Sequence, residues 1–308
     1  MRRVVPVLCV MSAVFSAVLL PMAVRAENAC RYRADRAAEA SADGIRKIVV
    51  EVGAGSLDIR GEPGRQRIEA SGEACAPDEE SLEHLQIHVE RRFGTLVIST
   101  KPPMSIREPS SWFGGGDRGD GRLDISIKVP AGIAVDVEDG SGDARISNVG
   151  DLDITDGSGS LHIENIDGSV ELFDGSGDVT IARVRGSVSV KDGSGEIEIE
   201  QVTGDVKIPN DGSGGIAIVD VQGSVTIGND GSGDIRIERV GGSVKIGNDG
   251  SGEIRISHVK RDVTVDHDGS GAIVVEDVDG DLSIGEHGSG GVRHARIGGS
   301  VSVRGNDR

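Results

Sequence analysis

Short runs of alternating aliphatic and polar residues fill the second half of the chain. In the segment 230–248, counted from Asp230, Val or Ile stands at offsets 5, 7, 10, 14 and 16, separated by polar residues or glycine. Alternation with a period of two is typical of a strand that buries one face, and Val and Ile favour such a surface. Similar spacing recurs in the neighbouring segments, and no run there follows the 3.6-residue period of a helix. The pattern predicts an all-β region.

A four-residue motif, Asp-Gly-Ser-Gly, separates these runs at a nearly constant interval. Eight copies and a final His-Gly-Ser-Gly follow one another at spacings of 17, 18 and 18 residues and then 19 residues five times. Self-similarity at a short fixed period is the mark of a solenoid, in which each repeat forms one coil. We therefore predict a single-stranded parallel β-helix of about nine coils of 17–19 residues. The copies begin at Asp139, Asp156, Asp174, Asp192, Asp211, Asp230, Asp249, Asp268 and His287.

The phase of the aliphatic positions predicts where each coil turns. Offsets 5 and 7 are out of phase with offsets 10, 14 and 16, which places one corner near offsets 8 and 9. A second corner is expected after the motif serine and a third at the junction between coils, which gives three short sides per coil. Successive coils would stack at ~4.8 Å. Because the corners are short and uniform, the sequence predicts no cleft on the solenoid.

The first residues resemble a secretory signal rather than part of the fold. Arg2 and Arg3 precede an apolar stretch that is short for a membrane span, and small residues lead to Ala26. We expect cleavage after Ala26, export to the periplasm or the cell surface, and no membrane span. The remaining chain divides into an N-terminal β cap region at 27–101, a flexible loop at 102–121 rich in Pro, Ser and Gly, and the solenoid at 122–308.

Strand-like segments within the cap region are expected at 45–52, 56–60, 87–89 and 96–100, with a helical turn between Ala76 and Leu85. The run Val52-Gly-Ala-Gly-Ser-Leu57 looks like a degenerate copy of the later corner. This likeness indicates a cap that continues into the solenoid. An open end of a sheet needs such a cover.

Two cysteines, Cys30 and Cys75, remain once the signal is removed. In an oxidising compartment, the simplest prediction is one disulfide between them. The whole chain has 33 basic and 51 acidic residues, a net charge of −18, and the signal carries three of the arginines. Such an acidic protein repels nucleic acid and anionic lipid. We expect a protein or another envelope component as the partner.

The aspartates that open the motif are the strongest candidate for a chemical site. Stacked coils would align their carboxylates at ~4.8 Å, and calcium is one ion that such oxygens could hold. The favoured interpretation is that each aspartate caps its own turn and stays solvated, with no metal and no cofactor. The calcium alternative concerns Asp174, Asp192, Asp211, Asp230, Asp249 and Asp268. Asn210, Asn229 and Asn248 share another offset and predict a stacked asparagine ladder.

Three features together resemble a known family. They are the Gly-Ala-Gly-Ser-Leu segment at 53–57, the strand Ile127-Lys-Val-Pro-Ala-Gly-Ile133, and the repeated Asp-Gly-Ser-Gly coils. The chain over residues 45–308 resembles the bacterial "putative adhesin" family of β-strand repeat proteins, a family of unknown function. The resemblance implies a parallel β-helix and carries no catalytic residues to transfer.

The sequence favours an exported, non-enzymatic β-solenoid that acts as an envelope scaffold or an adhesion-type binding module. The alternative is a self-assembling structural protein of the envelope, and a β-helix enzyme acting on polysaccharides ranks third. A monomer is expected, because His294 replaces an aliphatic residue in the last coil. Charges at an exposed strand edge resist pairing with another chain, and arginines cluster around His294 at Arg293, Arg296, Arg304 and Arg308.

Overall fold

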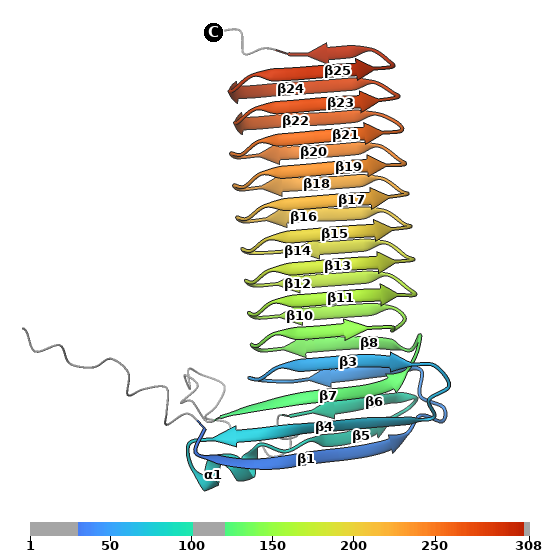
Figure 1. The fold of residues 1–308 in the computed structure, drawn as a ribbon, viewed down its shortest axis with the longest axis vertical. Coiled ribbons are helices and arrows are strands. Elements are labelled where there is room, and N and C mark those ends of the chain that lie inside the picture. The colour runs from blue at the N-terminus through green and yellow to red at the C-terminus, as the bar shows by residue number, and fades with distance from the viewer. Residues whose placement is uncertain (1–29, 101–120, 305–308) are drawn as a thin grey trace, which may run out of the picture.

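The computed structural model describes residues 30–100 and 121–304, and in them the chain forms a rod of stacked coils (Figure 1). The cap lies at one end of the rod and the last coil at the other. The expected signal at 1–26 lies outside the described residues, as does the expected loop at 102–121 apart from Gly121. In the described part of the chain, no helix has the length and hydropathy of a membrane span.

Two sheets of 13 strands each form the two faces of the rod. The first sheet contains, in spatial order, β1 (Tyr32–Ser41), β4 (Arg67–Ala76), β7 (Arg122–Pro130), β3 (Leu57–Glu62), β9 (Ala144–Ser147), β11 (Leu161–Ile166), β13 (Val179–Val184), β15 (Ile197–Val202), β17 (Ile216–Val221), β19 (Ile235–Val240), β21 (Ile254–Val259), β23 (Ile273–Val278) and β25 (Val292–Ile297).

The second sheet is built in the same way from the other half of each coil. It contains, in spatial order, β26 (Val301–Val303), β24 (Leu282–Ser289), β22 (Val263–Ser270), β20 (Val244–Asp249), β18 (Val225–Asp230), β16 (Val206–Asp211), β14 (Val188–Lys191), β12 (Val170–Asp174), β10 (Leu152–Asp156), β8 (Ala134–Asp139), β2 (Lys47–Glu51), β6 (Thr95–Ser99) and β5 (His88–Arg92). Equivalent strands of successive coils pair in parallel, as in β17 with β19 and β18 with β20. The predicted all-β parallel solenoid is confirmed.

Each coil has two sides, so the prediction of three sides is wrong. In β11, Leu161, Ile163 and Ile166 all point inward from one strand, although they stand at offsets 5, 7 and 10. The residue between them at offset 9, Asn165, has a φ of 56° and drops out of the pairing register with β13. One extra residue in a strand is a β-bulge, and it shifts the inward phase without turning the chain. The expected corner at offsets 8 and 9 is therefore a bulge.

The two real corners lie elsewhere in the coil. One is the Asp-Gly-Ser-Gly motif, which combines the expected second and third corners. The other follows offset 10, where residues 167–169 connect β11 to β12. On the outside of the motif corner, Asn229 donates to Asn210 at 2.9 Å and Asn248 donates to Asn229 at 2.7 Å. The predicted asparagine ladder is confirmed.

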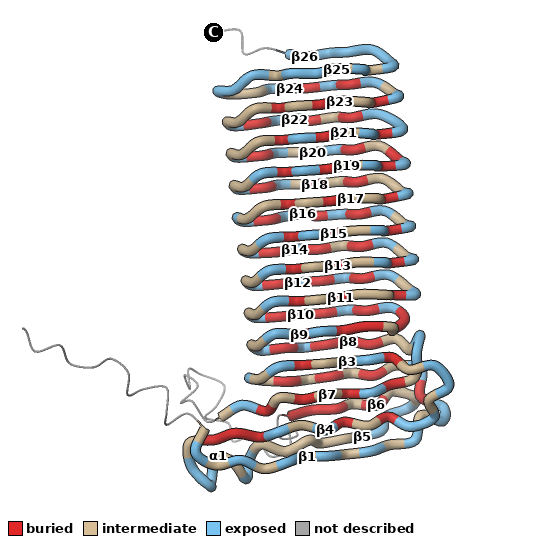
Figure 2. Tube along the Cα trace, viewed as in Figure 1, coloured by how far each residue is buried: buried red, intermediate tan, exposed pale blue. Residues whose placement is uncertain are grey.

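A narrow aliphatic core runs between the two sheets. The five inward positions are buried in each of the eight coils that begin with aspartate, and Ile237 in β19 has no exposed surface. Figure 2 shows these positions recurring as buried segments along every coil except the last. In that coil His294 is exposed and Val301 keeps 42% of its surface. The last coil, in which His294 replaces an aliphatic residue, is therefore open to water.

The cap continues the coil pattern at its base. β2 pairs in parallel with β8, β3 pairs with β9, and Ala54 bridges Ser141 between them. The degenerate Gly-Ala-Gly-Ser segment thus forms a corner between β2 and β3, and the two strands make one more coil of the solenoid. The short helix α1 (Glu79–His84) forms where the helical turn was expected, and Asp78 caps it by accepting from the Ser81 backbone N–H at 2.7 Å.

The long antiparallel strands β1 and β4 were not foreseen from the sequence. They pair along ten residues and cover the end of the first sheet through β7. The sequence of β1 mixes alanine with charged residues without strict alternation, and its positions are only half-buried or exposed. Alanine and charged residues have low strand propensity, so the sequence gives only a weak strand signal here.

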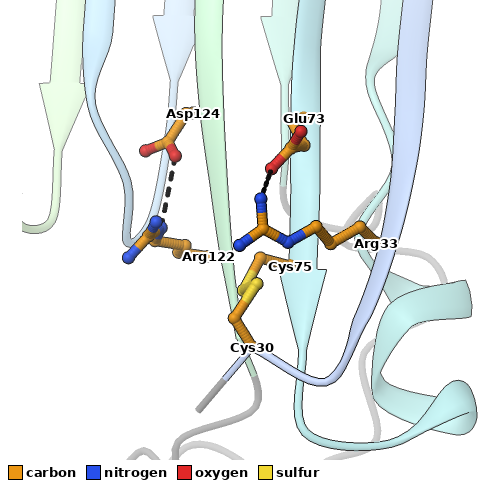
Figure 3. Close-up of a disulfide and its surroundings, with 6 residues drawn as sticks. All are labelled: Cys30, Arg33, Glu73, Cys75, Arg122 and Asp124. Atoms are coloured by element: carbon orange, nitrogen blue, oxygen red, sulfur yellow. Dashed lines mark hydrogen bonds and ion pairs between the residues drawn. A yellow bond between two sulfur atoms is a disulfide. The ribbon is translucent and has the colours of Figure 1, made fainter. Parts of the chain in front are cut away.

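A disulfide ties the start of the described chain to the end of β4. Cys30 and Cys75 are bonded, with their Cα atoms 5.1 Å apart. Figure 3 shows the bond beside Arg33 and Glu73, whose side chains pair at 2.9 Å. The bond therefore joins β1 and β4 covalently at one end of their antiparallel pair.

We expect the disulfide to be present in exported protein and to stabilise the cap. Mass spectrometry without reduction should show a peptide that links Cys30 to Cys75. Replacing both cysteines with serine should cost about 4 kcal/mol on the chain-entropy view of a loop of this length, measured by chemical denaturation. Two free thiols in protein purified from an oxidising compartment would contradict the assignment.

Candidate functional site

A groove follows the corner after offset 10 along much of the rod. It begins beside Pro63 and Ala131 at the cap and ends beside His258 and Lys260. Its volume is about 1330 Å³. We call it the corner groove. The expectation that short, uniform corners leave no cleft is wrong, because the bulges raise one wall of the groove above its floor.

The first wall consists of the bulge residues at offset 9. All have a left-handed backbone conformation, with φ between 55° and 59°. This conformation turns the bulge side chain out of the pleat. The residues in this wall are Asn148, Asn165, Arg183, Gln201, Asp220, Arg239 and His258.

Hydrogen bonds between coils hold this wall together. Arg183 donates to the side-chain oxygen of Asn165 at 2.6 Å, and Arg239 donates to Asp220 at 2.5 Å. Both pairs join residues one coil apart. The pairing limits the freedom of the long arginine side chains, so the wall presents an ordered array of amide, carboxylate and guanidinium groups.

The second wall lies at offset 11 and is more varied. It contains Asp167, Arg185, Thr203, Gln222, Gly241 and Lys260. Arg185 pairs with Asp167 across one coil at 3.1 Å. Three successive coils, those with Thr203, Gln222 and Gly241, carry no charge in this wall. The floor between the walls is formed by the aliphatic residues at offset 10, such as Val202 and Val221, which are almost fully buried.

The backbone along the groove is already committed to bonds between coils. The carbonyl of Val184 accepts from the N–H of Thr203 at 2.9 Å, and the carbonyl of Val202 accepts from that of Gln222 at 2.9 Å. A ligand in the groove therefore meets side chains rather than free backbone groups. Addition of a peptide strand needs an unpaired backbone edge, and the groove does not offer one along these coils.

The motif aspartates form a second feature, inside the other corner. We call Asp139, Asp156, Asp174, Asp192, Asp211, Asp230, Asp249 and Asp268 the Asp column. Their exposed fractions lie between 1% and 8%. The expectation that these carboxylates stay solvated is wrong. The turn-capping role is confirmed where Asp174 accepts from the Ser176 N–H at 3.2 Å and Asp192 from the Ser194 N–H at 3.1 Å.

Burial changes the acidity of the Asp column. Desolvation raises the pKa of Asp174 and Asp211 to about 7, with the charges of the neighbouring column carboxyls as the next cause. The same two causes raise the pKa of Asp230 and Asp249 to about 6. Among the described residues, no group of three or more His, Cys, Asp or Glu side chains is arranged to hold a metal ion.

Comparisons with known proteins give one family match. The model of the family described as Toastrack DUF4097 matches residues 45–286. Among curated proteins, none matches the chain.

Solved structures of similar length also resemble the chain. One from Bacteroides fragilis, described as a "putative adhesin", is 15% identical over 85% of this chain and 97% of its own, with a TM-score of 0.33. One from Parabacteroides distasonis, described as a "putative lipid binding protein", is 15% identical over 87% and 96%, with a TM-score of 0.34. One from Clostridium sporogenes, described as a "putative cell adhesion protein", is 11% identical over 86% and 99%, with a TM-score of 0.33. At these identities and TM-scores, the likenesses carry no inference about ligand or activity.

Proposed function

The chain belongs to the Toastrack family DUF4097, and from its corner groove we propose a non-enzymatic binding module that holds a linear glycan of the cell envelope. The protein is exported by the segment at 1–26 to the periplasm or the cell surface and works mainly as a monomer. The observation that carries the proposal is the groove itself, a straight channel with ordered polar walls.

The dimensions of the groove suit a single extended chain. The first wall spans seven coils, from Asn148 to His258, which is six steps and ~29 Å of rod. The volume of 1330 Å³ also includes the stretch beside Pro63 and Ala131, so dividing it by that length gives an upper limit of about 46 Å² for the mean cross-section. This is room for one polymer chain and too narrow for a folded partner.

The chemistry of the walls suits hydroxyl groups. The amides of Asn165, Gln201 and Gln222 and the hydroxyl of Thr203 can each donate and accept, as sugar hydroxyls do. The arginines of the groove are already paired with groups of the same chain, so they add little attraction for an acidic ligand. The groove walls contain no Phe, Tyr or Trp side chain on which a sugar ring could stack. Affinity per sugar should therefore be low and should grow with the number of coils that the glycan covers.

The positions of the acidic groups argue against hydrolysis of the glycan. The two carboxylates in the groove walls, Asp167 and Asp220, stand three coils apart, ~14 Å along the rod. Glycoside hydrolases place their two carboxyl groups roughly 5–9.5 Å apart on either side of the bond. Both aspartates are also bonded to arginines, Asp167 to Arg185 and Asp220 to Arg239. These pairs favour a binding groove over a catalytic one.

We expect long linear oligosaccharides to bind more tightly than short ones of the same linkage. Fragments of cellulose and of chitin, each in several lengths, are suitable probes, with affinity measured by titration calorimetry. Thr203→Trp or Gln222→Trp should fill the groove and weaken binding at least tenfold. Both positions are exposed, so the fold should tolerate the larger side chain.

Matched controls lie on the outer face of the second sheet. Thr264→Trp in β22 and Ser283→Trp in β24 place the same bulk on outward positions away from the groove, and they should leave binding unchanged. Equal affinity for short and long chains, or equal loss in the groove and control variants, would contradict the proposal. Capture of only a protein partner from a crosslinked envelope fraction would favour a protein ligand instead.

A further inference from the structure

The Asp column is aligned by the sheet itself. In the second sheet the register pairs Asp139 with Asp156, and Asp156 with Asp174. The same register joins Asp211, Asp230, Asp249 and Asp268 in one unbroken series. Paired residues of parallel strands are ~4.8 Å apart, so Asp156, Asp230 and Asp249 each have another carboxyl above and below them. The position of each aspartate in its strand directs the carboxyl toward the interior of the coil.

The carboxyls from Asp156 to Asp268 lack some of the hydrogen-bond partners that buried carboxylates need. From Asp156 to Asp268, one oxygen or both of each carboxyl are buried without a hydrogen-bond partner of good geometry among the described residues. Both oxygens are in this state in Asp211, Asp230 and Asp249. A buried acceptor without a partner is costly, and a buried charge without one is more so. Native proteins keep such atoms rarely, so a missing partner calls for an explanation.

The groups that face the column are mostly further carboxyls. Asp178 and Asp234, just beyond the motif, raise the pKa of Asp192 and Asp249 by their negative charge. The backbone N–H groups of the two residues after Asp211 and after Asp230 lower the pKa of these two carboxyls, but burial outweighs them. Burial also raises the pKa of Asp268 at the C-terminal end of the column, and there the positive charges of His287 and His267 act against the rise.

We propose that the Asp column is a proton-sharing ladder, in which carboxyls of neighbouring coils bond to one another through protons held at neutral pH, and that the rod loses stability when rising pH removes those protons. A protonated carboxyl donates one hydrogen bond and keeps its acceptor oxygen, so it can bridge to the carboxylate of the next coil. Each shared proton supplies a partner for an oxygen that otherwise has none. Its loss to water leaves two adjacent buried carboxylates that repel each other.

The direction of the pH effect follows from the raised pKa values. In the unfolded chain these aspartates titrate near their ordinary value of 3.8, whereas in the rod four of them titrate at about 6 or 7. Between these limits the folded state binds more protons than the unfolded state, so the free energy of unfolding falls as pH rises. The stability is fully present below the unfolded value and is lost as pH rises through the folded values.

The test compares thermal unfolding across pH in three proteins. The wild-type midpoint should fall by at least about 5 °C between about pH 5 and about pH 8. The triple variant Asp211→Asn, Asp230→Asn, Asp249→Asn should lose most of that dependence and should be the more stable protein at the higher pH. Infrared spectra of the wild type should show the C=O band of protonated carboxyls near neutral pH, and the band should be much weaker in the variant.

A charge-matched control separates the ladder from general repulsion in an acidic protein. Asp153→Asn, Glu171→Gln and Glu198→Gln also remove three negative charges, but these side chains are exposed on the outside of the coils. This control should keep the wild-type slope. An equal change of slope in both triple variants would overturn the proposal, and so would a wild-type protein without the protonated-carboxyl band. The infrared result on the wild type decides the question if the asparagine variant does not fold.

Cation binding is the competing explanation for the column. If calcium raised the wild-type midpoint at about pH 8, chelator lowered it, and the asparagine variant lost both effects, the column would hold cations and not protons. We expect neither calcium nor chelator to move the midpoint by more than about 2 °C. The corner groove lies at the other corner of the coil. Failure of the proton-sharing proposal would therefore leave the glycan-binding proposal intact, and the reverse also holds.

Discussion

Replacing Ile237 with aspartate should unfold the rod or destabilise it by at least about 4 kcal/mol. Ile237 has no exposed surface and stands in register with Ile218 and Ile256 in the neighbouring coils. An aspartate there would be an unpaired charge between aliphatic neighbours on both sides. Because each coil supports only the two next to it, the defect would also separate the coils on either side. Circular dichroism and chemical denaturation measure the loss.

The adjacent outward residue provides the control. Arg236 is exposed and bonded to Glu238 at 3.0 Å, a surface pair that contributes about 1 kcal/mol or less. Arg236→Asp should therefore leave the rod folded, with a small loss of stability. Similar losses in the two variants would contradict the assignment of inward and outward positions.

Replacing Gly214 with alanine should cost at least about 3 kcal/mol, because the motif corner has no room for a side chain there. The residue has a φ of +139°, a conformation that other residues rarely adopt. A Cβ atom at this position would lie 1.7 Å from the carbonyl oxygen of Gly195 in the preceding coil. The coils could accept it only by moving apart, which would break the stacking of backbone hydrogen bonds.

The next residue in the chain is a matched control. A Cβ atom on Gly215 would approach nothing closer than 3.4 Å, and that neighbour is the end of the flexible Glu196 side chain. Other coils carry larger residues at this offset, such as Asp178 and Asp234. Gly215→Ala should change stability by about 0.5 kcal/mol or less. Thermal unfolding of the two alanine variants side by side gives the answer, and equal midpoints would contradict the described corner.

The repeat predicts the stacked architecture because the physics of a solenoid is local. Each coil has the same spacing of Val and Ile and the same glycine corner, and each pairs only with its neighbours. The predicted inward positions, such as Ile237 and Val244, are therefore buried in the structure. The asparagine ladder follows for the same reason, since equal offsets in equal coils must be stacked.

The bulge could not be told from a corner by the phase of the aliphatic residues. A turn and an extra residue in a strand both reverse the inward phase, and the hydrophobic pattern records only that reversal. The residues at offset 9 are also chemically diverse, since Asn165, Arg183 and Gln201 occupy the same position. No glycine marks the left-handed conformation there. Because the bulge residues form one wall of the corner groove, a prediction without the bulge could not include the groove.

The sequence analysis placed the Asp column in solvent because aspartate is a residue type that usually lies at the surface. Charged residues are almost never fully buried unless they are paired. The alternation gave a signal that was not used: the motif aspartate is in phase with offsets 14 and 16 in the 18-residue coils, as Asp174 is with Val170 and Leu172. Phase within the strand therefore predicts an inward carboxyl in these coils, but not in the 19-residue coils, where Asp230 is buried although it is out of phase with Val225 and Ile227.

The most direct test of the central claim is to locate a bound glycan on the rod by NMR. The claim is that the polar walls raised by the bulges form a binding groove for a linear glycan. Addition of a long cellulose or chitin fragment to isotope-labelled protein should shift the amide signals of Gln201, Thr203 and Gln222, along with their neighbours at the same corner. Signals from outward residues of the second sheet, such as Thr264 and Ser283, should not shift. Shifts confined to that sheet or to the cap, or no shifts with any linear glycan, would contradict the account.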